Sequence, residues 1–297
     1  MAAAPGCGIC SGPTRLLHAG TAGGPRPEDL SPTCHRTGAH GDLYRCRRCG
    51  TVRQEGLPPG PALVDLYRLM RDDGYLAEEA GRRATARRLL ERVERVTGRG
   101  RLLDVGCGHG LLLDEAARRG WQVLGLEPSA AARAHAVGAL GLPVRDATPA
   151  DLDPAERFTA IVLADVIEHF ADPVAELRRC AGHLAPGGAL LVVTPDPASL
   201  TARVARGRWW GYIPAHTHLL PRRTLQRLLE SSGLRVVSDR GLRRTFSLRY
   251  WAAGLAERGG AAARAAARLD GAPIGRLPVT LSLGDERVVL AVRDERA

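Results

Sequence analysis

Four of the seven cysteines form two closely spaced pairs, an arrangement typical of metal binding. Cys7 and Cys10 make one C-x-x-C pair, and Cys46 and Cys49 make the other. Each pair turns two thiolates toward one point, so that together they supply the tetrahedral Cys₄ set of a zinc site. Four protein ligands leave no open position for a substrate. We therefore predict a structural zinc that holds a segment too poor in apolar residues to form a core of its own.

The other cysteines have different interpretations. Cys34 is followed by His35, and either of them offers an alternative fourth ligand, although adjacent residues cannot easily reach the same tetrahedron together. Cys107 lies in a glycine-rich loop and Cys180 in an apolar helical stretch, where a thiol acts as a small packing group. We expect neither of them to bind metal.

A glycine-rich turn marks the second place where chemistry is expected. Asp104 is followed by Gly106, Gly108 and Gly110, between a strand-like run and a helical stretch that starts at Leu111. Glycines at such a turn let a nucleotide approach the backbone, and the free N–H groups of the next helix favour a negatively charged group. The spacing is G-x-G-x-G, and the chain has no lysine to complete a phosphate-binding P-loop.

Carboxylates follow at the ends of the next strand-like runs. Glu127 ends the second run, where it can accept hydrogen bonds from both hydroxyls of a ribose. Asp146 and Ala147 follow the third run, in a place suited to an adenine amino group, and Asp165 ends the fourth. Each carboxylate alone is equally compatible with a helix cap or a solvated loop. Their order along the chain is what predicts a cofactor site.

A candidate for proton transfer comes directly after the fourth run. Glu168 and His169 stand at the edge of the predicted sheet, and a histidine there can accept a proton near neutral pH. An equally open interpretation is that the pair only shapes the pocket. His216 and His218 lie further along, and with no third ligand evident we favour substrate contact or packing over metal binding.

These residues require a scaffold of alternating strands and helices. Strands are predicted at 102–105, 122–126, 142–145, 160–163, 190–193, 234–237 and 287–292, and helices at 111–119, 130–139, 173–183, 222–231 and around 254–269. Such alternation predicts an α/β fold with a doubly wound, mostly parallel sheet. A helical pattern over 62–96 precedes it, and Tyr67 and Tyr75 in that pattern are interpreted as packing residues.

The series LLDVGCGHG, GLEPS, RDA, ADVIEHFADP and LAPGGALLVVTPD resembles the motifs of class I methyltransferases that use S-adenosylmethionine (SAM). The resemblance implies a Rossmann-like sheet of seven strands with the last one antiparallel. It also places Asp104 and the glycines at the methionine end of SAM, Glu127 on the ribose and Asp146 beside the adenine.

The cysteine pairs resemble those of zinc-bearing sugar C-methyltransferases from natural-product pathways. In these enzymes a Glu-His at the place of Glu168 and His169 is the catalytic pair. They carry a further C-terminal domain, which has no counterpart in this shorter sequence.

The charge of the chain is unevenly distributed. The net charge is +10, and between Leu200 and Tyr250 eleven arginines stand against two acidic residues. The aromatic residues Trp209, Trp210 and Tyr212 lie among these arginines, a combination suited to an anionic acceptor such as a nucleotide sugar. The alternative is a solvated surface in a chain rich in arginine throughout.

Taken together, the sequence predicts three units: a zinc-binding cap at 1–57, a helical bridge at 58–98 and a SAM-dependent domain at 99–297. The expected reaction is O- or C-methylation of a small molecule in natural-product biosynthesis. The alternative is an RNA base methyltransferase, but nucleic acid is not the expected partner. Without a leader or a long apolar run we expect a cytoplasmic protein that does not associate with membranes. The oligomeric state stays open.

Overall fold

The computed structural model describes residues 4–21, 25–31, 39–72, 74–256, 269 and 272–294. The predicted alanine-rich helix around 254–269 and the alternative ligands Cys34 and His35 fall wholly or largely outside these residues. In that part of the chain the structure has α8 (Leu248–Ala256).

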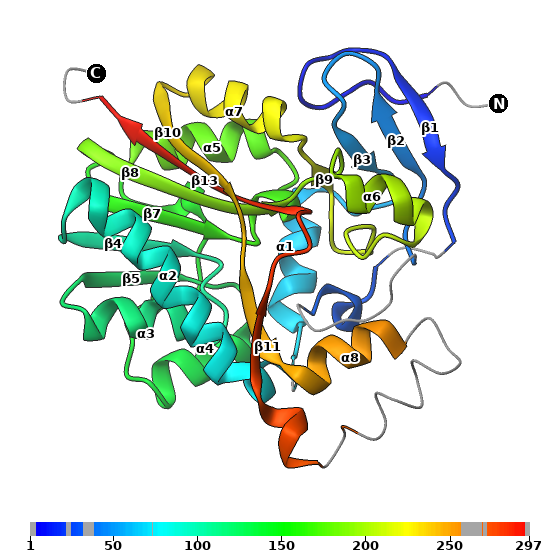
Figure 1. Cartoon of the computed structure of the whole chain (residues 1–297). Coiled ribbons are helices and arrows are strands. Elements are labelled where there is room, and N and C mark those ends of the chain that lie inside the picture. The colour runs from blue at the N-terminus through cyan, green and yellow to red at the C-terminus, as the bar shows by residue number, and fades with distance from the viewer. Residues whose placement is uncertain are drawn as a thin grey trace.

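A central sheet of seven strands dominates the fold (Figure 1). Its order is β10-β13-β8-β7-β4-β5-β6. The bounds are β4 (Arg101–Val105), β5 (Gln122–Leu126), β6 (Val144–Arg145), β7 (Phe158–Ala164), β8 (Leu184–Pro195), β10 (Leu234–Gly241) and β13 (Glu286–Arg293). β13 is antiparallel to both of its neighbours, whereas β4, β5, β6, β7 and β8 pair in parallel. The predicted α/β fold class and the antiparallel last strand are confirmed.

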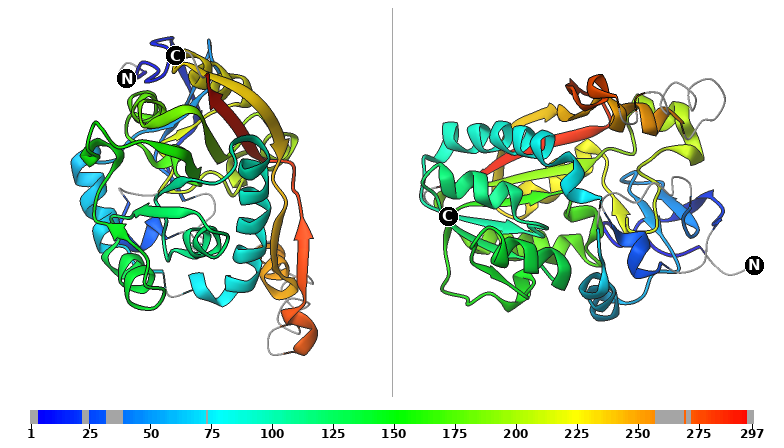
Figure 2. Two further views of the ribbon diagram at one scale, coloured as in Figure 1. Left: turned by 90° about the vertical axis from the view of Figure 1, so that its left-hand side faces the viewer. Right: turned by 90° about the horizontal axis from the view of Figure 1, so that it is seen from below.

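Helices cover both faces of this sheet (Figure 2). One face packs against α2 (Glu79–Thr97), α3 (Leu111–Arg118) and α4 (Ala130–Gly138), and the other against α5 (Pro173–Gly182) and α7 (Arg222–Ser231). Successive strand residues point to opposite faces, so Leu102 joins the first helical layer and Leu103 the second. Both are fully buried, which explains why the strands read as unbroken apolar runs.

A second, small sheet contains the cysteine pairs. It consists of β1 (Thr14–His18), β2 (Leu43–Cys46), β3 (Val52–Gln54) and β9 (His218–Leu219), in that order, with the short helix η1 (Pro27–Leu30) nearby. β9 comes from the far part of the chain, and in Figure 1 the blue strands lie beside β9 and α6 (Leu200–Ala205). We use the name cysteine unit for β1, β2, β3 and the loops that carry the four cysteines.

The cysteine unit shares its apolar core with the segment after β8. Leu43 and Val52 of the unit pack with Trp209, Tyr212 and Leu219, and all five are buried. The unit therefore has no separate core, as its composition indicates. The three predicted units remain an interpretation, to which the structure adds that β9 and its flanks lie with the first unit.

The bridge differs from the single helical pattern predicted over 62–96. It consists of α1 (Gly60–Leu69), the short helix η2 (Tyr75–Glu78) and α2. Met70 is extended, and the side chain of Asp72 accepts a hydrogen bond from the N–H of Gly74 at 3.2 Å. This Asp-based turn satisfies the backbone in place of the helix, which explains the break.

The remaining elements complete the edges of the fold. β11 (Arg244–Ser247) and β12 (Pro278–Leu281) pair antiparallel, and β11 packs on α2. The short helices are η3 (Pro149–Asp151), η4 (Ile167–His169), η5 (Arg206–Arg208) and η6 (Pro273–Arg276). Several predicted strand boundaries were wrong, since β6 has two residues, β8 begins at Leu184 and not at Leu190, and β10 extends to Gly241. Among the described residues, none of the helices has the length and apolarity needed to span a bilayer.

The contact between α2 and β11 yields a test of the packing. A Cβ atom on Gly81 would lie 2.2 Å from the carbonyl oxygen of Thr245, whereas one on Gly138 in α4 would meet nothing within 4 Å. We expect Gly81→Ala to lower the free energy of unfolding by about 1–3 kcal/mol. Gly138→Ala, the control, should raise it by about 0.5–1 kcal/mol. Denaturant unfolding of both variants measures their free energies of unfolding. Equal values for the two variants would contradict the close contact between Gly81 and Thr245.

Candidate active site

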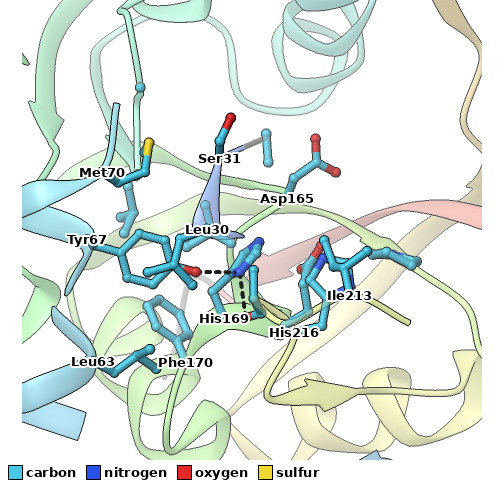
Figure 3. Close-up of a pocket in the computed structure, with 18 of the residues that line it drawn as sticks. Leu30, Ser31, Leu63, Tyr67, Met70, Asp165, His169, Phe170, Ile213 and His216 are labelled. Atoms are coloured by element: carbon cyan, nitrogen blue, oxygen red, sulfur yellow. Dashed lines mark hydrogen bonds between the residues drawn. The ribbon is translucent and has the colours of Figure 1, made fainter. Parts of the chain in front are cut away.

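One large cavity opens at the carboxyl ends of β4, β5, β7 and β8. Its volume is about 2340 Å³, and its walls come from α1, the glycine loop, η4, the segment after β8, and β11. Figure 3 shows part of it, with side chains from the bridge, η1, η4 and the segment around Ile213 turned toward a common centre. The space exceeds the roughly 300–1,000 Å³ of ordinary ligand pockets, so it has room for two ligands side by side.

The glycine loop forms one wall, and its glycines have distinct requirements. Gly106, Gly108 and Gly110 all have positive φ, at 64°, 53° and 83°. A Cβ on Gly106 would lie 2.8 Å from Val166, and one on Gly110 2.8 Å from Leu142, so both close contacts demand glycine. Gly106 and Gly108 line the cavity, whereas Gly110 forms the N-cap of α3.

Glu127 ties this loop to the end of β5. Its Oε2 accepts a hydrogen bond from the N–H of Gly108 at 2.7 Å, and its Oε1 accepts one from the N–H of Ser129, also at 2.7 Å. Burial raises the pKa of Glu127, although these two N–H donors oppose the rise. Each oxygen retains a further lone pair, which can accept a hydrogen bond from a ligand in the cavity.

Asp104 lies beneath the loop and is almost fully buried. Burial, together with the nearby charge of Glu127, raises the pKa of its carboxyl to about 8. A carboxylate at this depth with so high a pKa is costly for the fold, which is typical of a residue kept for a ligand.

The other predicted cofactor residues differ in their surroundings. Ala147 lines the cavity, while Asp146 beside it is partly exposed and pairs with Arg68 and Arg133 at 3.4 and 3.2 Å. Asp165 lines the cavity with a left-handed φ of 59°, and both of its oxygens accept hydrogen bonds from Arg244 at 2.6 and 2.7 Å. The roles of these residues toward a cofactor remain predictions.

Glu168 and His169 face the opposite part of the cavity. The Oε2 of Glu168 accepts a hydrogen bond from the hydroxyl of Thr194 at 3.0 Å, and burial raises the pKa of this carboxyl well above its usual range. The Nδ1 of His169 lies 2.7 Å from the hydroxyl of Tyr67 and 3.0 Å from the carbonyl oxygen of Ala215 (Figure 3). Burial lowers the pKa of His169.

The structure separates the two histidines of the PAHTH segment. His216 lines the cavity, and its ring centroid lies 4.9 Å from that of His169. The Nδ1 of His218 lies 3.4 Å from the carbonyl oxygen of Phe170 and 3.1 Å from the hydroxyl of Thr217. His216 therefore lies on the cavity wall, whereas His218 joins the packing between η4 and β9, and contact of His216 with a substrate remains a prediction.

Two residues that we interpreted as packing groups also line the cavity. Tyr67 contacts His169, and Tyr75 stacks on the ring of His109 with centroids 4.6 Å apart. Helical periodicity marks both as inward-facing but cannot tell a core from a cavity. The break after α1 turns the bridge over the glycine loop, and nothing in the pattern predicts that turn.

The rest of the wall is mostly apolar. Apolar side chains lie around the contacting pair Tyr67 and His169 (Figure 3), namely those of Leu30, Leu63, Met70, Phe170 and Ile213. This surface suits a ligand with a flat or apolar body.

The arginine-rich segment contributes little charge to the cavity. Arg208 lines it, but Arg222 is bound to Asp239 at 2.6 Å and does not line it, and Arg244 is held by Asp165 and Glu286. The indole N–H groups of Trp209 and Trp210 both donate to Asp285, at 2.8 and 2.6 Å. The expectation that this whole segment faces an acceptor was therefore too broad.

Comparison with known proteins places these features in a family. Residues 64–239 match a family model described as a methyltransferase domain. This span is more than half of the chain. The chain belongs to this methyltransferase family.

Several proteins resemble this methyltransferase. A ubiquinone biosynthesis O-methyltransferase of Bradyrhizobium sp. (strain ORS 278) is 44% identical over 99 residues, which cover 32% of this chain and 39% of that protein. One of Rhodopseudomonas palustris (strain BisA53) is 36% identical over 154 residues, or 48% of this chain and 61% of that protein. The chain thus matches less than two thirds of the length of either relative.

Solved structures support the fold. A SAM-dependent methyltransferase from Archaeoglobus fulgidus superposes with a TM-score of 0.52 at 18% identity, covering 75% of this chain and all of that one. The predicted resemblance to class I SAM-dependent methyltransferases is confirmed for family and fold.

Outside the cavity, the methyltransferase brings its four predicted metal ligands together. The Sγ atoms of Cys7 and Cys49 are 3.6 Å apart and those of Cys10 and Cys46 3.5 Å, and all four lie within 4.8 Å of one another. A zinc ion about 2.3 Å from each of four tetrahedral sulfurs would separate them by about 3.8 Å, whereas a disulfide has sulfurs about 2.05 Å apart. The donor set therefore fits a zinc ion.

Backbone N–H groups also point at these sulfurs. The N–H of Ile9 donates to Cys7, and those of Arg48 and Cys49 donate to Cys46, each at 3.4 Å. Burial raises the pKa of Cys46, but the N–H groups of Cys49 and Arg48 together with the thiols of Cys10 and Cys49 lower it to about 6, whereas burial raises the pKa of Cys7 to about 12. Such donors stabilise thiolate, which is the form that binds a metal.

Asp104 provides a test of the cost of the site. Its pKa is raised in the fold, so the stability it contributes is present at acid pH and is lost as the pH rises toward about 8. We expect Asp104→Asn to raise the melting temperature of the ligand-free chain at pH 8 and to change it little at pH 5. The exposed Asp294, paired with Arg235, is the control, and Asp294→Asn should show no such pH dependence. If Asp104→Asn changed the melting temperature equally at pH 5 and pH 8, the raised pKa of Asp104 would be contradicted.

Proposed function

We propose that this chain transfers the methyl group of SAM to a hydroxyl of a small-molecule acceptor. The observation that carries the proposal is that one cavity joins the glycine loop and Glu127 to Glu168, His169 and Tyr67. The names of the relatives, which are O-methyltransferases, favour oxygen over carbon as the methylated atom.

The cofactor would occupy the side of the cavity formed by the glycine loop. Gly106 and Gly108 leave room for its methionine portion, and Asp104 lies beneath them. Glu127 would accept the ribose hydroxyls, with Asp146 and Ala147 near the adenine and Asp165 at the rim. SAM supplies an already activated methyl group, so the protein has to orient the acceptor and receive its proton.

The acceptor would lie beside Tyr67 and His169, whose side chains contact each other. The Nδ1 of His169 contacts the carbonyl oxygen of Ala215, which can only accept, and also the hydroxyl of Tyr67. We assign the ring proton to Nδ1 because of the carbonyl oxygen, and this tautomer would leave a lone pair on Nε2. The Nε2 atom would take the hydroxyl proton, so that the acceptor oxygen can attack. SAM, when bound, would supply the activated methyl group, with its sulfur as the leaving group.

The acceptor class follows from the wall. Apolar and aromatic side chains predominate, which favours an aromatic or otherwise apolar body. Arg208 lines the cavity and has no ion pair among the described residues, so it would bind a negative group on the acceptor, such as a carboxylate or the phosphates of a nucleotide sugar. Such acceptors are consistent with natural-product biosynthesis. No observation on the described residues favours the RNA alternative.

We also propose that zinc binds Cys7, Cys10, Cys46 and Cys49 and stabilises the cysteine unit as a cap at residues 1–57. The bridge at 58–98 would then close the cavity of the domain at 99–297. A zinc site made of four reduced thiolates suits a reducing compartment, and on this ground we propose the cytoplasm.

Removal of zinc tests the role of the cysteine unit. We expect Cys46→Ser to lose one zinc per chain and to lower the melting temperature by several degrees, because the metal replaces a core that the unit lacks. Cys180→Ala, in the core of the large domain, should keep that zinc while also losing stability. Metal analysis and thermal unfolding measure both, and full zinc content in Cys46→Ser would overturn the ligand set.

Methyl transfer itself is tested with labelled SAM. Incubation with a small-molecule extract of the source should move the label to a hydroxyl compound, and calorimetry should detect SAM binding. His169→Asn should retain SAM affinity and lose roughly 10²–10⁴-fold in turnover. The half-buried His183 lies next to the start of β8, at the opposite end of that strand from the cavity, and His183→Asn should retain turnover. Absence of SAM binding by the intact chain would refute the proposed function, and full turnover of His169→Asn would refute the role of His169.

A further inference from the structure

Three buried or half-buried side chains at the acceptor side form a cluster of potential metal ligands. Glu168, His169 and His216 each offer one ligand atom, and these atoms all lie within 4.8 Å of one another. The sequence places His216 far from the other two and pairs it with His218, so the cluster exists only in the folded chain. It is separate from the four cysteines.

Both histidines keep one ring nitrogen free. The Nδ1 of His216 lies 2.7 Å from the carbonyl oxygen of Gly211, and the Nδ1 of His169 lies 3.0 Å from that of Ala215. A carbonyl oxygen can only accept, so we assign the proton of each ring to Nδ1, which in His169 also contacts the hydroxyl of Tyr67 at 2.7 Å. In this tautomer each Nε2 has a lone pair. Metal-binding histidines are typically held in this way, with the second nitrogen donating to a backbone carbonyl.

Glu168 contributes an unsatisfied oxygen. Its side chain is 1% exposed, and Oε2 is bound by Thr194, but Oε1 has no hydrogen-bond partner among the described residues. A buried oxygen of a carboxyl group without a partner is destabilising, and a cation beside it would remove that cost. No arginine among the described residues forms an ion pair with Glu168, although Arg244 pairs with Asp165 and Glu286 nearby.

We propose that Glu168, His169 and His216 bind a divalent transition-metal ion of the zinc type. Two imidazoles and one carboxylate are the protein ligands of catalytic zinc sites, in which the fourth position is left to water or substrate. All three residues line the cavity, so that open position faces the acceptor. The binding of the ion is independent of the proposed function, whereas its catalytic role rests on it.

The ion would replace the imidazole in handling the proton of the acceptor. A hydroxyl bound to such an ion ionises near neutral pH, as bound water does. The proton leaves to solvent, the metal-bound oxygen forms the bond to the methyl carbon, and the C–S electron pair returns to sulfur. His169 then serves as a ligand and cannot act as the base.

The cysteine unit holds the segment that supplies the third ligand. The N–H of Gln54 donates to the carbonyl oxygen of Thr217 at 3.0 Å, and the side chain of Gln54 donates to Pro214 at 2.9 Å. These bonds flank His216 on both sides. The four cysteines thus stabilise one ligand of the second site from outside it.

A cobalt titration tests the proposal. The intact chain is first loaded with one zinc per chain at the cysteines and then titrated with Co²⁺. We expect a second equivalent to bind with weak visible absorption and without the intense sulfur-to-metal band of a thiolate site. His216→Ala and Glu168→Gln should weaken this binding by at least about 100-fold, and His218→Ala, the control in the same segment, should retain it.

The outcomes separate the two hypotheses. Because His216 also lines the cavity, a loss of turnover in His216→Ala supports the metal site only when the second ion is lost with it. Unchanged Co²⁺ binding in His216→Ala, or no second ion in the intact chain that still methylates, would overturn it and leave the proposed function intact. Binding of the second ion by a chain that does not bind SAM would support the site and refute the proposed function.

Discussion

The backbone of Thr217 makes the hydrogen bonds on which the acceptor side of this structure depends. Its N–H donates to the carbonyl oxygen of Glu168 at 2.8 Å, and its carbonyl oxygen accepts from the N–H of Gln54. Its hydroxyl contacts the carbonyl oxygens of Glu168 and Phe170 at 2.9 and 2.6 Å. One residue thus joins the cysteine unit to the end of β7. These bonds, together with the contact between the Nδ1 of His169 and the carbonyl oxygen of Ala215, hold His216 beside His169.

The cofactor side depends on a different constraint, which is local. Parallel strands direct their carboxyl ends to one edge, and the glycine loop turns there because Gly106 and Gly110 are too close to Val166 and Leu142 for any side chain. Glu127 then binds the N–H of Gly108, which fixes the loop against β5. The glycine loop and Glu127 are close in sequence, whereas Val166 follows β7.

Both sides carry a cost to stability. Asp104 and Glu168 are buried carboxyl groups whose pKa values burial raises. Folded proteins keep such groups where a ligand will interact with them, and a more stable side chain would remove the interaction. Apolar wall residues such as Leu63 and Ile213 add to the cost of burying these carboxyl groups, because they offer no hydrogen bonds in place of water.

The sequence by itself determined the α/β fold, the order of the cofactor carboxylates and the two cysteine pairs, because these follow from periodicity and from motifs of a few adjacent residues. It also indicated Glu168 and His169. It did not show that Tyr67 lines the cavity, since nothing in the pattern predicts the break at Met70. It also did not show that Arg208 lines the cavity while Arg222 does not. The meeting of His216 with Glu168 and His169 was decided by tertiary structure alone. Local spacing sets which side chains share a strand end, but contacts between distant segments arise only when β3 and β9 pair and bury Trp209 and Leu219 between them.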